Sequence, residues 1–196
     1  MSRGVLYIVS GPSGTGKGTI CAELVKKLDI YLSVSATSRD IRKGEIKDVT
    51  YHYITPDEFK ELIENDKMLE WAVYSDNYYG TPKEEIEKNL NAGRDVILEI
   101  EPQGAMQVKS KMPDAVLLFI VPPSMSVLRE RLIGRGRESE AEIDKRIKAA
   151  KWEFSQAEKY NDIVVNDDLD TCVNYIISLM QKYKNERKII EKLLNE

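Results

Sequence analysis

The feature that most constrains how this chain folds is a glycine-rich segment near its start, Gly11–Lys17, with the sequence GPSGTGK. A short apolar run of strand-forming residues, Val5–Val9, precedes it. The stretch Lys17–Leu28 follows with apolar residues at helical spacing, and its expected buried face consists of Ile20, Leu24, Val25 and Leu28. Glycines let the backbone turn so that several N–H groups point inward, and the helix adds its positive dipole end. Strand, glycine-rich turn and helix together predict an α/β fold that opens with a phosphate-binding loop.

The segment matches the pattern G-x-x-x-x-G-K, in which the lysine brings positive charge to the β and γ phosphates of a nucleotide. A glycine-rich turn without a ligand is the alternative, and the strand before it and the helix after it argue against that. We expect nucleotide contacts from Gly11, Pro12, Ser13, Gly14, Thr15, Gly16, Lys17, Gly18 and Thr19.

Gly18 stands where such a loop usually carries Ser or Thr, whose hydroxyl coordinates Mg²⁺. Two interpretations stay open. Thr19, one residue further on, contributes to phosphate or metal contacts, or Mg²⁺ is held mainly by phosphate oxygens and water, an arrangement it tolerates well. We favour the second, with no protein group assigned as a direct metal ligand.

Further apolar runs predict the rest of a central parallel sheet. Asp95–Ile100 and Ala115–Val121 are short and continuous, as strands buried on both faces are, and Ile163–Val165 is expected to be a last short strand. Leu32–Ala36 is a further candidate strand. A long helix is expected from about Leu169, with an apolar face made by Leu169, Val173, Ile176, Ile177 and Met180.

Two segments differ in character from this α/β core. Aromatic residues cluster with polar neighbours in the first, which therefore resembles an inserted lobe: Tyr51, Tyr53, Trp71, Tyr74, Tyr78 and Tyr79. Within it, Thr55 is a good N-cap for a helix beginning at Pro56, because Glu58 follows three residues later. The second segment, Ser124–Lys148, is polar and rich in arginine, and is a candidate mobile flap.

Composition excludes several classes of protein. With 42% hydrophobic and 32% charged residues the chain is typical of a globular domain, and its net charge of −4 argues against a nucleic-acid surface. The longest apolar run, Val116–Val121, is too short to span a bilayer, and we expect no signal peptide and a cytoplasmic location. Cys21 and Cys172 match no metal or redox spacing and are expected to be free thiols. Positive charge gathers instead in two arginine groups, one near Arg39 and one near Arg131, which suggests a small anionic ligand held at two places.

Several motifs in order resemble those of one family: SVSATSRDIRKGE (Ser33–Glu45), LEWAVYSDNYYGTP (Leu69–Pro82), LEIEPQGA (Leu98–Ala105), RLIGRGRESE (Arg131–Glu140) and VVNDD (Val164–Asp168). Together they resemble the bacterial guanylate kinases over nearly the whole chain. The resemblance implies the P-loop nucleoside monophosphate kinase fold, and transfer of phosphate from ATP to GMP and dGMP, with Mg²⁺ accompanying ATP. It also implies three parts: a core (1–33, 87–123 and 150–196), a GMP-binding lobe (34–86) and a lid (124–149).

The resemblance also implies roles for individual residues. The clamp on the GMP phosphate is expected from Arg39, Arg42, Tyr51 and Tyr79. Contacts on the side of the guanine base, and near it, are expected from Ser35, Glu70, Thr81, Glu99 and Glu101. Contacts to the transferred phosphoryl group are expected from Lys17, Arg42, Arg131, Arg135 and Arg146. Contacts to the base and ribose of ATP are expected from Asn166 and Asp167.

The chemistry of the residue types agrees with these roles. Two arginines three positions apart can hold one phosphate dianion, and a carboxylate such as Glu70 can accept from both N1–H and N2–H₂ of guanine. Adenine presents an acceptor at N1 and would be repelled, a mismatch worth about 10⁴-fold in discrimination. The sequence departs from the family where Ile41 replaces a common proline and where Glu101 replaces a common aspartate.

Two other functions compete with this one. A related kinase of a sugar phosphate would have no guanine edge for Ser35 and Glu70 to bind. A non-catalytic guanylate-kinase-like module that binds phosphoproteins could discard Lys17 and the lid arginines, which are present here. The oligomeric state stays undecided.

Overall fold

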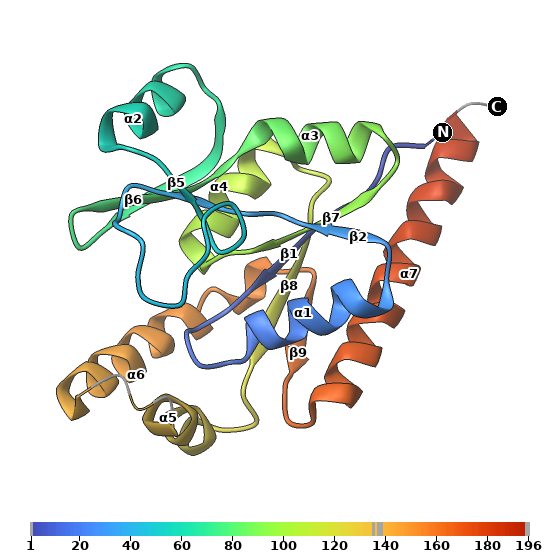
Figure 1. The fold of residues 1–196 in the computed structure, drawn as a ribbon. Helices are drawn as coiled ribbons and strands as arrows, with labels where there is room; N and C mark the ends of the chain where they lie inside the picture. The colour runs from blue at the N-terminus through green and yellow to red at the C-terminus, as the bar shows by residue number, and fades with distance from the viewer. Residues whose placement is uncertain (1, 135, 137–138, 195–196) are drawn as a thin grey trace.

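A five-stranded parallel sheet forms the centre of the molecule (Figure 1). The computed structural model describes residues 2–134, 136 and 139–194. The strands lie in the order β2-β7-β1-β8-β9, and every neighbouring pair is parallel. Their bounds are β1 (Leu6–Ser10), β2 (Ile30–Leu32), β7 (Asp95–Glu99), β8 (Val116–Val121) and β9 (Asp162–Val165). The apolar runs predicted β1, β7, β8 and β9 to within one residue at each end.

The central position of β1 explains its composition. All five of its residues are buried, because strands flank it on both edges and helices cover both of its faces. Since the strands are parallel, their carboxyl ends meet at one edge of the sheet. The glycine-rich loop after β1, Glu101 after β7 and Asn166 after β9 are therefore brought together at this edge.

Helices cover both faces of the sheet, which confirms the three-layer core. Helices α1 (Lys17–Lys27) and α7 (Leu169–Leu194) pack on one face, and α3 (Lys83–Asn91) and α4 (Pro102–Lys111) pack on the other (Figure 1). In α7 the predicted face is confirmed, with Val173, Ile176 and Met180 buried. In α1 the prediction is wrong for Val25, which is 40% exposed, because Cys21 takes the place beside Ile20 and Leu24 instead.

A second sheet of four strands builds the inserted lobe, in the order β4-β3-β6-β5. Its strands are β3 (Ala36–Thr37), β4 (His52–Tyr53), β5 (Met68–Tyr74) and β6 (Asn77–Pro82). Helix α2 (Pro56–Glu64) covers it through Phe59, which packs against Met68. The predicted capping box is confirmed: the Glu58 N–H donates to Thr55 Oγ1 at 3.2 Å, and the Thr55 N–H donates to the Glu58 carboxylate at 2.6 Å.

The single strand predicted over Leu32–Ala36 is wrong, because the chain changes sheets within it. β2 ends at Leu32, and β3 begins at Ala36. Between them, the Ser33 N–H still donates to Ile97 O of the core sheet, whereas Ser35 O already accepts from the His52 N–H of the lobe. The segment is apolar and extended, and its pattern therefore resembles one strand.

Two helices occupy the region expected to be a flap, α5 (Met125–Gly134) and α6 (Glu140–Phe154), followed by a short 3₁₀ turn, Ala157–Lys159. A capping box of Ser139 and Glu142 begins α6. The expected boundaries at 86/87 and 149/150 fall inside helices α3 and α6, so the chain passes them without a loop. No helix in the described part of the chain is both long enough and apolar enough to cross a membrane.

Candidate active site

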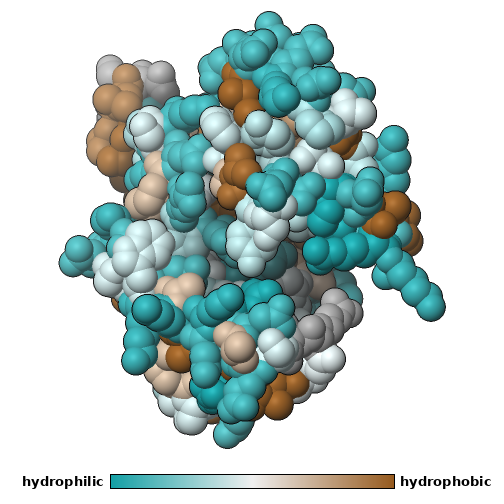
Figure 2. Space-filling model, turned by 90° about the vertical axis from the view of Figure 1, so that its left-hand side faces the viewer, coloured by the Kyte–Doolittle hydropathy of each residue, from teal (hydrophilic) through white to brown (hydrophobic). Residues whose placement is uncertain are grey.

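A cavity of about 630 Å³ lies between the phosphate loop and the inserted lobe. Ser13, Lys17 and Gly18 line it from the loop, whereas Ser35 and Tyr51 line it from the lobe. Glu99, at the carboxyl end of β7, and Glu101, two residues further on, also line it. Figure 2 shows a largely hydrophilic surface that is hollowed between its upper and lower parts.

The phosphate loop has the backbone that its glycines predict. Gly14 and Gly16 both have φ of +92°, a left-handed conformation that favours glycine. Helix α1 begins directly after Gly16, with no side-chain cap and no acidic residue in its first turn. The N–H groups and positive dipole end of α1 are therefore available to an anion.

Lys17 lies over its own loop. Its Nζ donates to Gly11 O at 2.6 Å and to Pro12 O at 3.0 Å, while Thr15 Oγ1 donates to the same Pro12 carbonyl at 2.9 Å. These contacts hold the ammonium group at the mouth of the loop, where the sequence motif predicts it.

The arginines from the α5–α6 region approach the loop from the other side. Arg146 Nη1 donates to Ser13 Oγ at 2.9 Å. Arg131 Nη2 donates to Asn166 O at 2.9 Å, and its buried Nη1 has no hydrogen-bond partner within the described residues. Arg135 lies outside the described residues. Two of the three expected lid arginines thus lie beside the phosphate loop.

Asn166 is buried beneath the phosphate loop. Its amide nitrogen donates to Thr15 O at 2.7 Å, and its backbone N–H donates to Val121 O at 2.8 Å. It therefore connects the end of β9 to the loop, a structural contact that the resemblance did not imply. Asp167, the other residue expected near the ATP base, is exposed.

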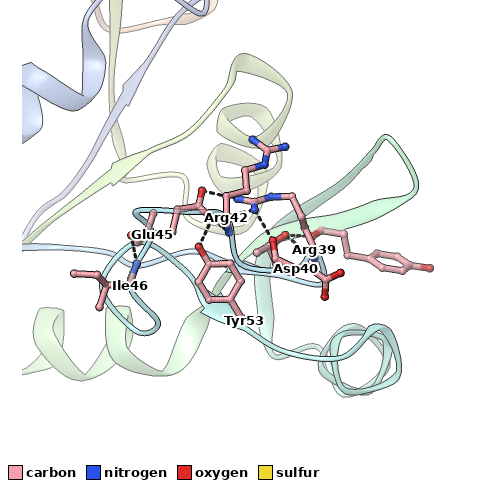
Figure 3. Close-up of polar contacts among 9 residues, drawn as sticks. Arg39, Asp40, Arg42, Glu45, Ile46 and Tyr53 are labelled. Carbon is pink, nitrogen blue, oxygen red and sulfur yellow. Dashed lines mark hydrogen bonds and ion pairs between the residues drawn. The ribbon is translucent and has the colours of Figure 1, made fainter. Parts of the chain in front are cut away.

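The expected phosphate clamp gathers around Arg39, which Figure 3 shows together with Arg42. Its guanidinium carbon lies 5.7 Å from the ring centre of Tyr51 and 5.9 Å from that of Tyr53. The Tyr51 and Tyr79 rings meet edge to face at 6.1 Å. Arg42 is on the same loop with an exposed side chain. The lobe thus brings together three of the four residues that the resemblance named for the clamp, Arg39, Tyr51 and Tyr79, and Arg42 lies exposed on the same loop as Arg39.

Glu70 is a buried carboxylate on β5. Its side chain accepts from Thr81 Oγ1 of β6 at 2.6 Å, and the residue is only 6% exposed. Burial raises the pKa of Glu70, the Thr81 hydrogen bond opposes this rise, and the charge of Glu101 adds to it. A buried acceptor of this kind fits a ligand that presents paired N–H donors.

One carboxylate, that of Glu99, stands beside Gly18, where the loop lacks its usual hydroxyl. A Cβ placed on Gly18 would lie 3.4 Å from both carboxylate oxygens of Glu99. This oxygen-rich environment fits Mg²⁺, which binds through few carboxylates and keeps several waters. Within the described residues no group of three or more His, Cys, Asp or Glu side chains could hold a metal ion.

Two residues near the site had no role in the sequence interpretation. Glu45 bonds to Arg39, and Glu153 of α6 is a partly buried carboxylate whose pKa is raised by burial and by the charge of Glu101. Lys17 and Arg146 oppose that rise, which places Glu153 close to both. The only sign in the sequence that Glu153 lies near the site is its position seven residues after Arg146, which puts both residues on the same face of α6.

Comparison with known proteins identifies the family. The sequence model described as guanylate kinase matches residues 3–183. The chain is 51% identical over 179 residues to a guanylate kinase of Caldanaerobacter subterraneus subsp. tengcongensis, covering 91% of this chain and 87% of that protein. The chain belongs to the guanylate kinase family. It is also 46% identical over 202 residues to a guanylate kinase of Clostridioides difficile, covering 100% of this chain and 98% of that one.

The fold agrees with the guanylate kinase family. The crystal structure of guanylate kinase from Anaplasma phagocytophilum matches with a TM-score of 0.76 at 32% identity, covering 93% of this chain and 87% of that chain. The family and the fold expected from the sequence motifs are therefore confirmed, and the chain is a kinase of nucleoside monophosphates. The two alternatives, a kinase of a sugar phosphate and a non-catalytic module that binds phosphoproteins, are not favoured.

Proposed function

We propose that this guanylate kinase transfers the γ-phosphoryl group of ATP directly to the phosphate of GMP, giving ADP and GDP. The observation that carries the proposal is the shared cavity: the phosphate loop forms one wall, and Ser35 and Tyr51 of the lobe form the other. Two nucleotides bound at these walls would meet at their phosphate ends. Both substrates are nucleotides of the cell interior, which favours the cytoplasm as the site of reaction.

The reaction needs positioning and charge neutralisation rather than a covalent intermediate. An oxygen of the GMP phosphate forms a bond to the γ-phosphorus while the bond from that phosphorus to ADP breaks. We assign Lys17 and the α1 N-terminus to the ATP phosphates, and Arg131 and Arg146 to the group in transfer. The unpartnered Nη1 of Arg131 supports this assignment, because a phosphate oxygen would satisfy a buried donor that has no partner in the described residues.

On the acceptor side, Arg39, Arg42, Tyr51 and Tyr79 would hold the GMP phosphate. Tyrosine hydroxyls add hydrogen bonds there without adding charge. Glu70 and Thr81, with Ser35 and Glu101, would bind the guanine base. Ionised Glu70 would accept from N1–H and N2–H₂, and adenine would present it with an acceptor instead.

Mg²⁺ fits the oxygen-rich surroundings of Gly18 and would neutralise charge on the ATP phosphates when bound with them. Glu99 faces the position that a side chain at residue 18 would take, so we assign it to hold metal-bound water rather than the metal itself. Thr19 is exposed on the first turn of α1 and is left as the alternative contact.

We also propose that the lobe (34–86) and the α5–α6 region (124–149) close over bound substrates. Closure would exclude water from the cavity and so prevent hydrolysis of ATP. Scattering profiles that are the same with and without a ligand joining both nucleotides would contradict closure.

The test of the function is a panel of acceptors with ATP and Mg²⁺. We expect turnover with GMP and dGMP and very little with AMP, CMP or UMP. A preference for AMP, or turnover of none of them, would refute the proposal. Turnover of a sugar phosphate, or binding of phosphopeptides without turnover of any nucleotide, would support one of the other functions.

A further inference from the structure

Glu45 accepts hydrogen bonds from three different residues of the lobe (Figure 3). Its Oε1 and Oε2 accept from Arg39 Nη2 and Nη1 at 2.8 and 3.0 Å, which is a bidentate pair. Oε2 also accepts from the backbone N–H of Arg42 and from the hydroxyl of Tyr53, both at 2.8 Å. One carboxylate therefore connects the two arginines expected to hold the acceptor phosphate.

The contact with Arg42 closes a turn in both directions. The Arg42 N–H donates to the Glu45 carboxylate, and the Glu45 N–H donates to Arg42 O at 3.0 Å. Ile41 precedes Arg42 at the position where the family commonly has a rigid proline. The reciprocal pair supplies another constraint on the backbone, and it does so without using the Arg42 side chain.

Arg39 is fixed more completely. Its side chain is 11% exposed and that of Glu45 is 19% exposed, so solvent screens the pair only weakly. The Glu45 carboxylate accepts from both terminal nitrogens of the Arg39 guanidinium, and Asp40 O accepts a further hydrogen bond from Nη1 at 2.6 Å. The buried Nε–H has no partner in the described part of the chain, so this donor remains for an added anion.

The bonds to Glu45 have a consequence for the charges. They lower the pKa of Glu45 to about 2, with the Arg39 guanidinium as the largest cause. The carboxylate is thus ionised whenever nucleotides are phosphorylated at neutral pH. If Glu45 competed with the phosphate for Arg39, it would have to release Arg39 when the phosphate binds. The Arg42 N–H and the Tyr53 hydroxyl hold Glu45 in place independently of Arg39.

We propose that Glu45 is a positioning residue that orders Arg39 and Arg42 for the phosphate of the acceptor nucleotide before it binds. The inference rests on the proposed function of the lobe. Glu45 itself does not touch the substrate; it fixes the end of the Arg39 guanidinium and the backbone of Arg42, and it leaves Arg39 Nε–H and the Arg42 side chain for the phosphate.

The test uses Glu45→Gln, which keeps the shape but removes the charge and opposes one Arg39 N–H with an amide NH₂. We expect KM for GMP to rise about 10- to 100-fold, because misplacement of binding groups by about 1 Å has an effect of this size. We expect kcat to change much less and KM for ATP to stay the same. Tyr53→Phe removes one of the donors and should give a smaller effect in the same direction. Glu61→Gln, an exposed change on α2, is the matched control.

Binding of GMP and of guanosine, measured by titration calorimetry or by ligand-observed NMR, separates positioning from damage to the lobe. Guanosine lacks the phosphate, so Glu45→Gln should weaken GMP and leave guanosine unchanged. Equal weakening of both ligands, unchanged binding of GMP, or tighter binding of GMP would each overturn the proposal. Tighter binding would mean that Glu45 competes with the phosphate. Failure of the unaltered protein to bind GMP would instead refute the proposed function.

Discussion

Gly104 gives the most direct test of how guanine is bound. It lies in α4 against Glu70, and a Cβ placed on it would stand 2.6 Å from Glu70 Oε2 and 3.1 Å from Glu70 Cδ. Ordinary contact for such atoms begins near 3.4 Å. In Gly104→Ala the carboxylate must therefore retreat by about 0.8 Å, because helix backbone is harder to move than a side chain.

The expected effect follows from that displacement. A shift approaching 1 Å in a group that positions the substrate can cost about 100-fold, so we expect KM for GMP to rise about 10- to 100-fold. KM for ATP should not change, because Glu70 lies in the lobe. Selectivity for GMP over IMP should also fall, since IMP lacks the N2 amino group that the displaced carboxylate would have bound.

The assay is steady-state turnover with GMP, IMP and AMP as acceptors, together with thermal unfolding. Ser110→Ala is the control, because it changes an exposed position of the same helix. A folded Gly104→Ala protein with KM for GMP within twofold of the original would refute the reasoning. It would mean either that Glu70 can retreat without loss or that guanine is bound elsewhere.

Three further predictions address the rest of the site. Lys17→Met should lower kcat by about 100- to 1,000-fold, because loss of one donor that stabilises the transition state has an effect of this size. GMP binding should stay intact. A fully active variant would contradict the assignment of the phosphate loop. Asn166→Ala should remove the hydrogen bond to Thr15 O and lower the free energy of unfolding by about 1–3 kcal/mol in denaturant melts. In steady-state kinetics it should raise KM for ATP but not for GMP. Unchanged stability would show that the hydrogen bond is dispensable. Burial raises the pKa of Glu70, and only its ionised form can accept from both N1–H and N2–H₂ of guanine, so guanosine affinity should fall as pH drops through that raised pKa. The same pH profile in Glu70→Gln would assign the titration to another group.

Short-range patterns predicted four of the five strands of the central sheet and the helices α1, α2 and α7. β1, the glycine-rich loop and α1 follow from residues that are neighbours in the chain, as does the capping box of Thr55 and Glu58. The same kind of pattern failed at Leu32–Ala36, where an extended apolar segment passes from one sheet to the other. It failed again at Val25, because helical spacing alone does not say which side of the apolar face is covered.

The sequence by itself determined the family, four of the five strands of the central sheet and the phosphate loop, because each depends on motifs or periodicities confined to a few neighbouring residues. Only the tertiary structure decided how the site is held. Asn166 binds Thr15 across 151 positions, and Arg146 binds Ser13 across 133. Glu70 of strand β5 is confined by Gly104 of helix α4, and Glu45 binds the two terminal nitrogens of the Arg39 guanidinium. Such contacts depend on how strands and helices pack against one another, and no local pattern of residues specifies that packing.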